Sequence, residues 1–222
     1  MIPWTLLDTA NLPDGSGTLR LKQRGSEFSI MLGSNELMNS RLSGSEEALA
    51  TLVCERLGGR PELLIGGLGM GFTLRAALAK LPAEASVIVA ELIPAVVAWA
   101  RGPMAGVFAG SLDDQRVTIA VADVATVITE GQGRYDAILL DVDNGPDGLT
   151  VAGNDRLYGA EGLQAAKAAL RPGGILAVWS AGPDHSFTKR LRSAGLKTEE
   201  VTARARRTGG GARHVIWLAT RS

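Results

Sequence analysis

The feature that most constrains this chain is a regular alternation of short apolar runs and helical patterns that begins at Pro61. The apolar runs are Glu62–Ile65, Ser86–Ala90, Val117–Val121, Ala137–Leu140 and Ile175–Trp179. Between them lie helical patterns at Phe72–Leu81, Pro94–Arg101, Val124–Glu130 and Ala160–Leu170. Strands that are apolar on both faces and separated by helices form parallel sheets with helices on both sides. The sequence therefore predicts an α/β fold built on a mostly parallel sheet.

The C-terminal segment predicts two further strands. A helical pattern at Ser186–Ala194 is followed by runs at Lys197–Thr202 and His214–Ala219, and the linker between these runs contains three consecutive glycines. Such a linker allows the last two strands to fold back as an antiparallel pair at one edge of the sheet. We therefore expect a Rossmann-like sheet of seven strands.

The first 42 residues differ from the rest. Period-two runs at Thr18–Gln23 and Glu27–Leu32 are separated by glycine turns, which predicts a small antiparallel meander. After the meander, Ser43 and Glu46 have the spacing of a capping box at the start of a helix. The expected domains are an N-terminal β-meander at 1–42 and a Rossmann-like nucleoside-binding catalytic domain at 43–222. The pattern alone assigns the meander no function.

Composition excludes several classes of function. The formal net charge is zero, and one cysteine with two histidines leaves too few ligands for a structural metal site. Residues 189–222 carry nine lysines and arginines against two glutamates, but they lack the series of interleaved aromatic residues that base stacking needs, since Trp217 stands alone among them. We expect a solvated basic edge and no nucleic-acid partner. No signal peptide and no membrane span is recognisable, so a cytoplasmic protein without a membrane partner is expected.

A glycine-rich loop is the strongest local signal. Gly67, Gly69 and Gly71 lie between a predicted strand and a predicted helix, where free backbone N–H groups can meet a ligand. The dinucleotide fingerprint fails because Phe72 stands where its third glycine is needed, and G-x-G-x-G is the spacing of nucleoside-sulfonium binders. Glu91 ends the second strand and is positioned to accept hydrogen bonds from ribose hydroxyls.

Asp123 ends the third strand and has two readings. Its carboxylate could accept a hydrogen bond from an adenine amino group, or it could cap the helix that begins at Val124.

A group of acids follows the fourth strand. Asp141 ends that strand, and Asp143 and Asp147 follow on a loop with Gly145-Pro146. Turn formation would explain the loop acids, whereas a functional cluster would hold a cation or take a proton from an amine. Binding of a metal ion by two carboxylates is the weaker functional alternative.

Three further aromatic or imidazole side chains are considered for the site. Tyr158 could orient a substrate or pack with its hydroxyl in water. Trp179 ends the fifth strand and could line a pocket or belong to the core. His214 opens the last strand and is expected to be structural.

From Pro61 to Ala219 the order of motifs resembles a class I S-adenosylmethionine-dependent transferase fold. More narrowly, the chain resembles the spermidine synthase family, whose small β-domain the meander also fits. The resemblance rests on Ile65-Gly-Gly67…Gly71…Leu74-Arg75, Glu91, Asp123, Asp141…Gly145-Pro146 and Leu157-Tyr158. It implies that Glu91 holds ribose, Asp123 meets adenine and Asp141 helps to deprotonate the attacking amine.

The resemblance implies a transferase that moves an aminopropyl group from a sulfonium donor to a small amine. Tyr158 would position the amine, and Asp143 and Asp147 would anchor its distal ammonium. Met70 stands where the family has an aspartate that contacts the aminopropyl amine, so the donor stays open between S-adenosylmethionine and its decarboxylated form. Two alternatives also stay open: a methyltransferase of unknown acceptor and a non-catalytic nucleoside-binding homologue. A homodimer is left open as well.

Overall fold

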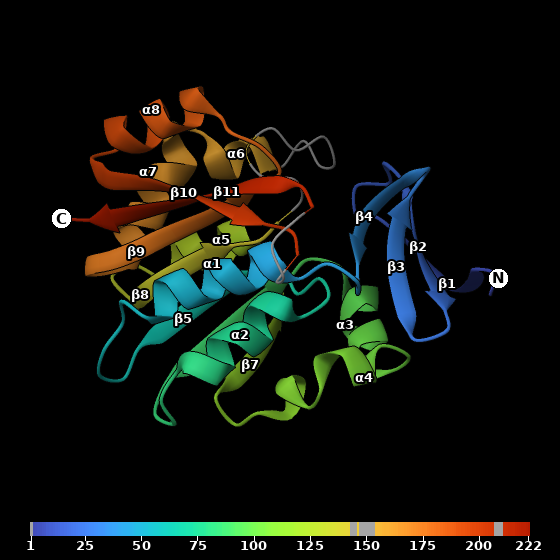
Figure 1. Cartoon of the computed structure of the whole chain (residues 1–222). Helices are drawn as coiled ribbons and strands as arrows, with labels where there is room; N and C mark the ends of the chain where they lie inside the picture. Colours follow the sequence, from blue (N-terminus) through green and yellow to red (C-terminus); the bar gives the residue numbers. More distant parts are fainter. Residues whose placement is uncertain (1, 143–145, 147–153, 207–210) are drawn as a thin grey trace.

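The computed structural model describes residues 2–142, 146, 154–206 and 211–222 of the chain, which form two β-sheets and the helices that cover the larger one (Figure 1). The strands are β1 (Thr5–Asn11), β2 (Thr18–Arg24), β3 (Glu27–Leu32), β4 (Asn35–Asn39), β5 (Glu62–Gly66), β6 (Ser86–Glu91), β7 (Val117–Val121), β8 (Tyr135–Leu140), β9 (Leu170–Ser180), β10 (Leu196–Arg204) and β11 (Arg213–Arg221). The helices are α1 (Gly44–Cys54), α2 (Phe72–Lys80), α3 (Pro94–Arg101), α4 (Ala105–Phe108), α5 (Val124–Glu130), α6 (Asn154–Tyr158), α7 (Ala160–Ala169) and α8 (His185–Ser193), with a 3-10 turn at Ser111–Asp113.

The larger sheet has seven strands in the order β10-β11-β9-β8-β5-β6-β7. The five adjacent strands β9, β8, β5, β6 and β7 are parallel to one another. Strand β11 is antiparallel to both of its neighbours, β9 and β10. The predicted α/β fold and its antiparallel last pair are confirmed. The strand order reverses at β5, which pairs with β6 on one side and β8 on the other. In open α/β sheets, ligands bind at the carboxyl ends of the strands beside such a reversal.

Alternating residues of the central strands feed two separate cores. Leu63 and Ile65 of β5 point to one face, where they pack with residues of α1, α2 and α3. Leu64, between them, points to the opposite face and packs with residues of α5, α7 and α8. This arrangement is the reason that the parallel strands are apolar along their whole length.

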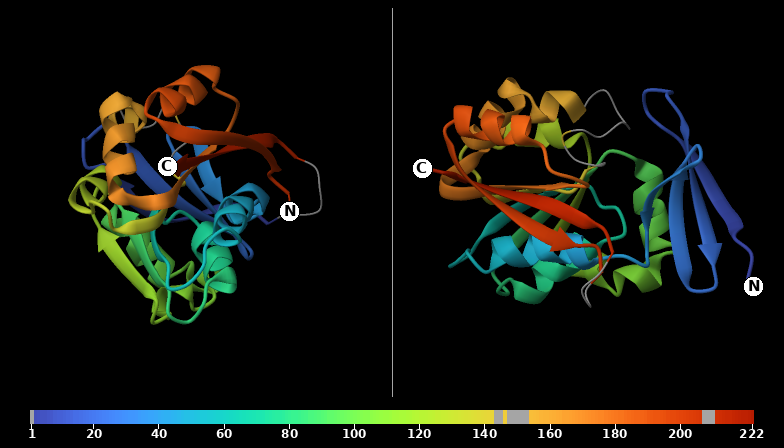
Figure 2. Two further views of the ribbon diagram at one scale, coloured as in Figure 1. Left: turned by 90° about the vertical axis from the view of Figure 1, so that its left-hand side faces the viewer. Right: turned by 45° about the horizontal axis from the view of Figure 1, so that its top comes forward.

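The four-stranded meander, in the order β1-β2-β3-β4, stands at the end of the molecule opposite the C-terminus (Figure 2). Its buried residues, among them Leu21 and Ile30, belong to the same core as α1, α2 and α3. The indole N–H of Trp99 on α3 also donates to Asp8 Oδ2 of β1 at 2.7 Å. The meander is therefore fixed to the larger sheet by apolar packing and by this hydrogen bond, while the division into domains at residue 42 stays a prediction.

The structure corrects the sequence analysis in two places. The sequence analysis did not predict β1, because nearly all of its side chains are exposed and the strand lacks period-two alternation. The predicted capping box at the start of α1 is wrong, since Ser43 is the N-cap residue but its side chain makes no capping hydrogen bond. The Glu46 side chain is turned toward a cavity instead.

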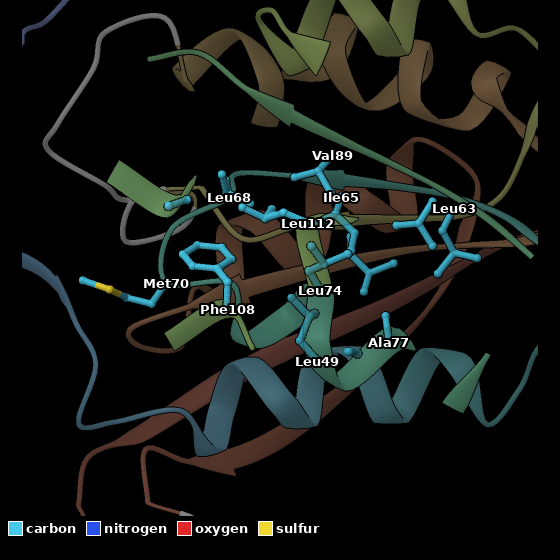
Figure 3. Packing of buried hydrophobic residues seen from close by; sticks show 14 of the residues in the cluster. Leu49, Leu63, Ile65, Leu68, Met70, Leu74, Ala77, Val89, Phe108 and Leu112 are labelled. Carbon is cyan, nitrogen blue, oxygen red and sulfur yellow. The ribbon is translucent and has the colours of Figure 1, made fainter. Parts of the chain in front are cut away.

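The glycine loop connects β5 to α2, and Figure 3 shows its Leu68 and Met70 side chains with the surrounding core. Gly71 is the N-cap of α2 with φ of +75°, and a Cβ placed on it would lie 2.4 Å from the Phe108 ring. Gly67 has φ of +90°, and its Cβ would lie 2.5 Å from the Asp141 carbonyl oxygen. Only glycine combines this backbone conformation with such close approach.

We therefore predict that Gly71→Ala lowers the free energy of unfolding by about 2–4 kcal/mol, because left-handed backbone strain adds to overpacking against Phe108. Gly69→Ala is the matched control: φ there is +49°, but its Cβ would meet only Met38 Sδ at an ordinary 3.6 Å. The control should lose about 1–2 kcal/mol from backbone strain alone. Urea unfolding of both variants measures the difference, and equal losses would contradict the packing argument.

Candidate functional site

Two adjoining cavities open at the carboxyl ends of the central strands. The first, here called the Glu91 cavity, has a volume of about 120 Å³, and the second, the Glu46 cavity, has about 80 Å³. Both are lined by Leu37, Met38, Gly69 and Asp141. The cavities therefore adjoin, with Asp141 and Gly69 of the glycine loop in the wall that they share.

Glu91 lies at the end of β6 and is only 8% exposed. Its Oε2 accepts a hydrogen bond from the Leu68 N–H at 3.0 Å, and its Oε1 accepts one from the Ile93 N–H at 2.9 Å. Burial raises the pKa of Glu91, and these backbone donors oppose the rise. Glu91 thus holds the glycine loop in place while lining its cavity; its contact with ribose stays a prediction.

Asp123 lines the Glu91 cavity, two residues after the end of β7. Its Oδ1 accepts a hydrogen bond from the Ala125 N–H at 2.9 Å, so it is the N-cap of α5. Of the two roles considered from sequence, the capping role is therefore present. The adenine contact stays a prediction.

Asp141 follows β8 and lines both cavities. Its Oδ2 accepts a hydrogen bond from the Thr73 hydroxyl at 2.6 Å. Burial and, secondly, the nearby Glu46 carboxylate raise the pKa of Asp141 to about 7, against the opposing effect of the Thr73 hydrogen bond. A carboxylate with a pKa near the working pH is suited to accept a proton from a substrate.

Glu46 is a site residue that the sequence analysis missed. It lies in the first turn of α1 and lines the cavity named after it. The Ser45 hydroxyl donates to its Oε2 at 2.7 Å, and burial raises the pKa of Glu46. The only local signal was the capping-box spacing, which suggests a different role.

The meander also contributes to the site, which no sequence pattern indicated. Leu37 and Met38 of β4 line both cavities, and Leu12 and Leu19 line the Glu91 cavity. The smaller sheet therefore supplies an apolar wall opposite the glycine loop.

The Glu46 cavity is acidic. Besides Glu46 and Asp141, its walls include the side chains of Met70, Phe72 and Trp179. Lys, Arg and His are absent from the described residues that line it. Charge complementarity therefore favours a cationic ligand with apolar segments.

Tyr158, another predicted site residue, is absent from the lining of both cavities. Tyr158 is 2% exposed in the second core, and its ring meets Phe187 edge to face at 5.6 Å. Its predicted role in positioning substrate stays a prediction. Asp143 and Asp147 lie outside the described residues.

Residues 2–142, 146, 154–206 and 211–222 lack two kinds of feature. Within these ranges, His, Cys, Asp and Glu side chains form no group of three or more that could hold a metal ion. Over the same part of the chain, every helix is too short or too polar to cross a membrane.

Comparisons with known proteins identify the family and the fold of the chain. Residues 44–190 match the family model of the spermine/spermidine synthase domain. Polyamine aminopropyltransferase 1 of Streptomyces coelicolor is 32% identical over 151 residues, covering 64% of this chain and 28% of the relative. The chain thus spans little more than a quarter of the length of that relative.

Solved structures show the same fold. Spermidine synthase from Thermotoga maritima superposes with a TM-score of 0.77 at 18% identity, covering 98% of this chain and 72% of that one. A spermidine synthase in complex with the transition-state analogue AdoDATO gives a TM-score of 0.76 with the same identity and coverage. Because the family model matches well over half of the sequence, the chain belongs to the spermine/spermidine synthase domain family.

Proposed function

We propose that the chain transfers an aminopropyl group from decarboxylated S-adenosylmethionine to a small amine. The observation that carries the proposal is the meeting of the two cavities at Asp141, with Glu91 and the glycine loop in one and an acidic chamber in the other. Family membership supports it, as does the fold likeness to a spermidine synthase that binds AdoDATO.

In this proposal the Glu91 cavity holds the nucleoside. Glu91 accepts hydrogen bonds from ribose, Asp123 contacts adenine, and Gly67, Gly69 and Gly71 let the backbone approach the donor. The apolar side chains of the meander cover the nucleoside and exclude water.

The acceptor amine occupies the Glu46 cavity, and Asp141 takes its proton. The freed nitrogen lone pair attacks the carbon bound to sulfur, the carbon–sulfur bond breaks, and its electron pair stays on sulfur. The products are methylthioadenosine and a lengthened amine. Tyr158 is proposed to position the amine, and Asp143 and Asp147 to hold its distal ammonium.

The other candidates differ in what they require of the site. A methyltransferase acting with S-adenosylmethionine is favoured by Met70, which places a thioether where a carboxylate would bind the aminopropyl amine. The non-catalytic alternative required Asp141 to face away from the pocket, whereas Asp141 lines both cavities. We further infer a small amine rather than nucleic acid as partner, and a cytoplasmic location. A homodimer remains a proposal.

The identity of the donor distinguishes the aminopropyltransferase from the methyltransferase. We expect isothermal titration calorimetry to show decarboxylated S-adenosylmethionine binding at least tenfold more tightly than S-adenosylmethionine, because the carboxylate of the latter would enter a chamber lined by Glu46 and Asp141. Tighter binding of S-adenosylmethionine would instead support the methyltransferase.

Glu91→Gln should weaken methylthioadenosine binding by about 10–100-fold, since a charge-assisted hydrogen bond is worth about 1.5–3 kcal/mol. Gln retains the shape of the side chain next to Leu68 and so limits disturbance of the loop. Glu130→Gln, at the exposed end of α5, is the control and should bind normally. Unchanged affinity in Glu91→Gln would remove Glu91 from the ribose site.

Asp141→Asn should keep methylthioadenosine affinity and lower turnover by about 10²–10⁴-fold, the range for a lost general base. The wild-type kcat/KM should rise with pH and level off above about 7, because Asp141 must be ionised to accept a proton.

The same pKa predicts the effect of Asp141→Asn on stability. Since the folded-state pKa lies above that of the unfolded chain, ionisation of Asp141 costs stability as pH rises from about 4 through 7. The melting temperature of Asp141→Asn relative to wild type should therefore be higher at pH 8 than at pH 5. A pH-independent difference would show that Asp141 is ionised at both values.

A further inference from the structure

His214 lies at the start of β11, outside both cavities, yet it contacts Trp179, which lines the Glu46 cavity, and Ser45, which is hydrogen-bonded to the Glu46 side chain. Its Nδ1 lies 2.8 Å from the Ser45 hydroxyl, and Ser45 in turn donates to Glu46 Oε2 at 2.7 Å. A hydroxyl has a single proton, so Ser45 cannot donate to both neighbours at once. Because Ser45 donates its hydroxyl proton to Glu46, His214 must carry a hydrogen on Nδ1 and donate it to the Ser45 oxygen.

The second contact of His214 is with an aromatic wall. The His214 ring meets the Trp179 ring edge to face, with centroids 4.7 Å apart. Trp179 lines the Glu46 cavity from the end of β9 and pairs with Ile216 of β11. One imidazole therefore contacts both the Ser45 hydroxyl on α1 and an aromatic side chain that lines the cavity.

This arrangement is well placed to orient Glu46. Ser45 is fully buried, so its hydroxyl has few alternative partners. Glu side chains have many rotamers, and holding one in its bound conformation removes part of the entropic cost of ligand binding. We propose that His214 is a positioning residue for the acceptor end of the site, orienting the Glu46 carboxylate through Ser45 and holding Trp179 with its ring.

The nature of the ligand in this inference rests on the proposed function. The coupling of His214 to Glu46 is independent of that function. Several elements around the site carry charged groups. Glu46 and Glu47 lie on α1, Asp141 follows β8, and Arg213 and Arg204 are paired residues of β11 and β10. Strand β9 contributes the neutral Trp179. Glu46 is joined to His214 by two hydrogen bonds that share the Ser45 hydroxyl.

The first test is independent of catalysis. The chain has two histidines, so ¹⁵N NMR of the labelled protein resolves each imidazole, with exposed His185 as the internal reference. We expect His214 to be the Nδ1–H tautomer when neutral. Glu46→Gln should lower the pKa of His214 by about half a pH unit or more, because a negative partner is removed. Glu130→Gln should leave it unchanged.

The second test uses catalysis. His214→Phe and Ser45→Ala should each raise the KM of the acceptor amine about fivefold to tenfold, the effect of one lost hydrogen bond, with a smaller change in kcat. His214→Asn should restore most of the loss, since its amide can donate from a position close to Nδ1. Methylthioadenosine affinity should stay within about twofold in all three variants, and His185→Phe should match wild type.

The results separate this inference from the proposed function. An Nε2–H tautomer that does not respond to Glu46→Gln would overturn the inference, whatever the enzyme does. A parallel loss of methylthioadenosine affinity in His214→Phe would also overturn it, because the role would then be general packing. If the NMR coupling is present but the wild-type protein transfers no aminopropyl group, the proposed function fails while the positioning of Glu46 stands.

Discussion

The site depends on how the glycine loop ties three strand ends together. The Gly67 N–H donates to the Ala90 carbonyl at the end of β6, and the Asp141 N–H donates to the Gly66 carbonyl at the end of β5. These bonds bring Gly67 so close to the Asp141 backbone that no other residue type would fit. Asp141 therefore reaches the junction of the two cavities with little freedom, which is what a proton acceptor at a reacting centre requires.

The site places acids where they destabilise the fold. Glu46, Glu91 and Asp141 all have pKa values raised by burial, so their ionised forms cost free energy in the absence of a ligand. Backbone N–H groups offset part of that cost for Glu91, and hydroxyls do so for the other two. A cationic substrate between Glu46 and Asp141 would offset more. Strained and destabilised groups of this kind are typical of functional sites.

Much of the site was predictable because it follows from strand order. Glu91, Asp123 and Asp141 each end a parallel strand, and the carboxyl ends of such strands meet at one edge. The glycine loop was recognisable because its backbone needs positive φ, which leaves a compositional trace. The substrate-binding roles of Asp143 and Asp147 remain predictions. The environment of Tyr158 could not be read from the sequence, because its ring packs against Phe187, 29 positions away.

The sequence by itself determined the α/β class, the seven-stranded sheet and the strand-end acids, because hydrophobic periodicity and glycine placement are local properties of the chain. Only the tertiary structure decided that Glu46 faces Asp141 and that Met38 of the meander forms a wall of both cavities. It also decided that His214 reaches Ser45 across 169 positions. Such contacts depend on the packing of distant elements, and a helical or strand period records which face of an element is buried but not which residue it meets.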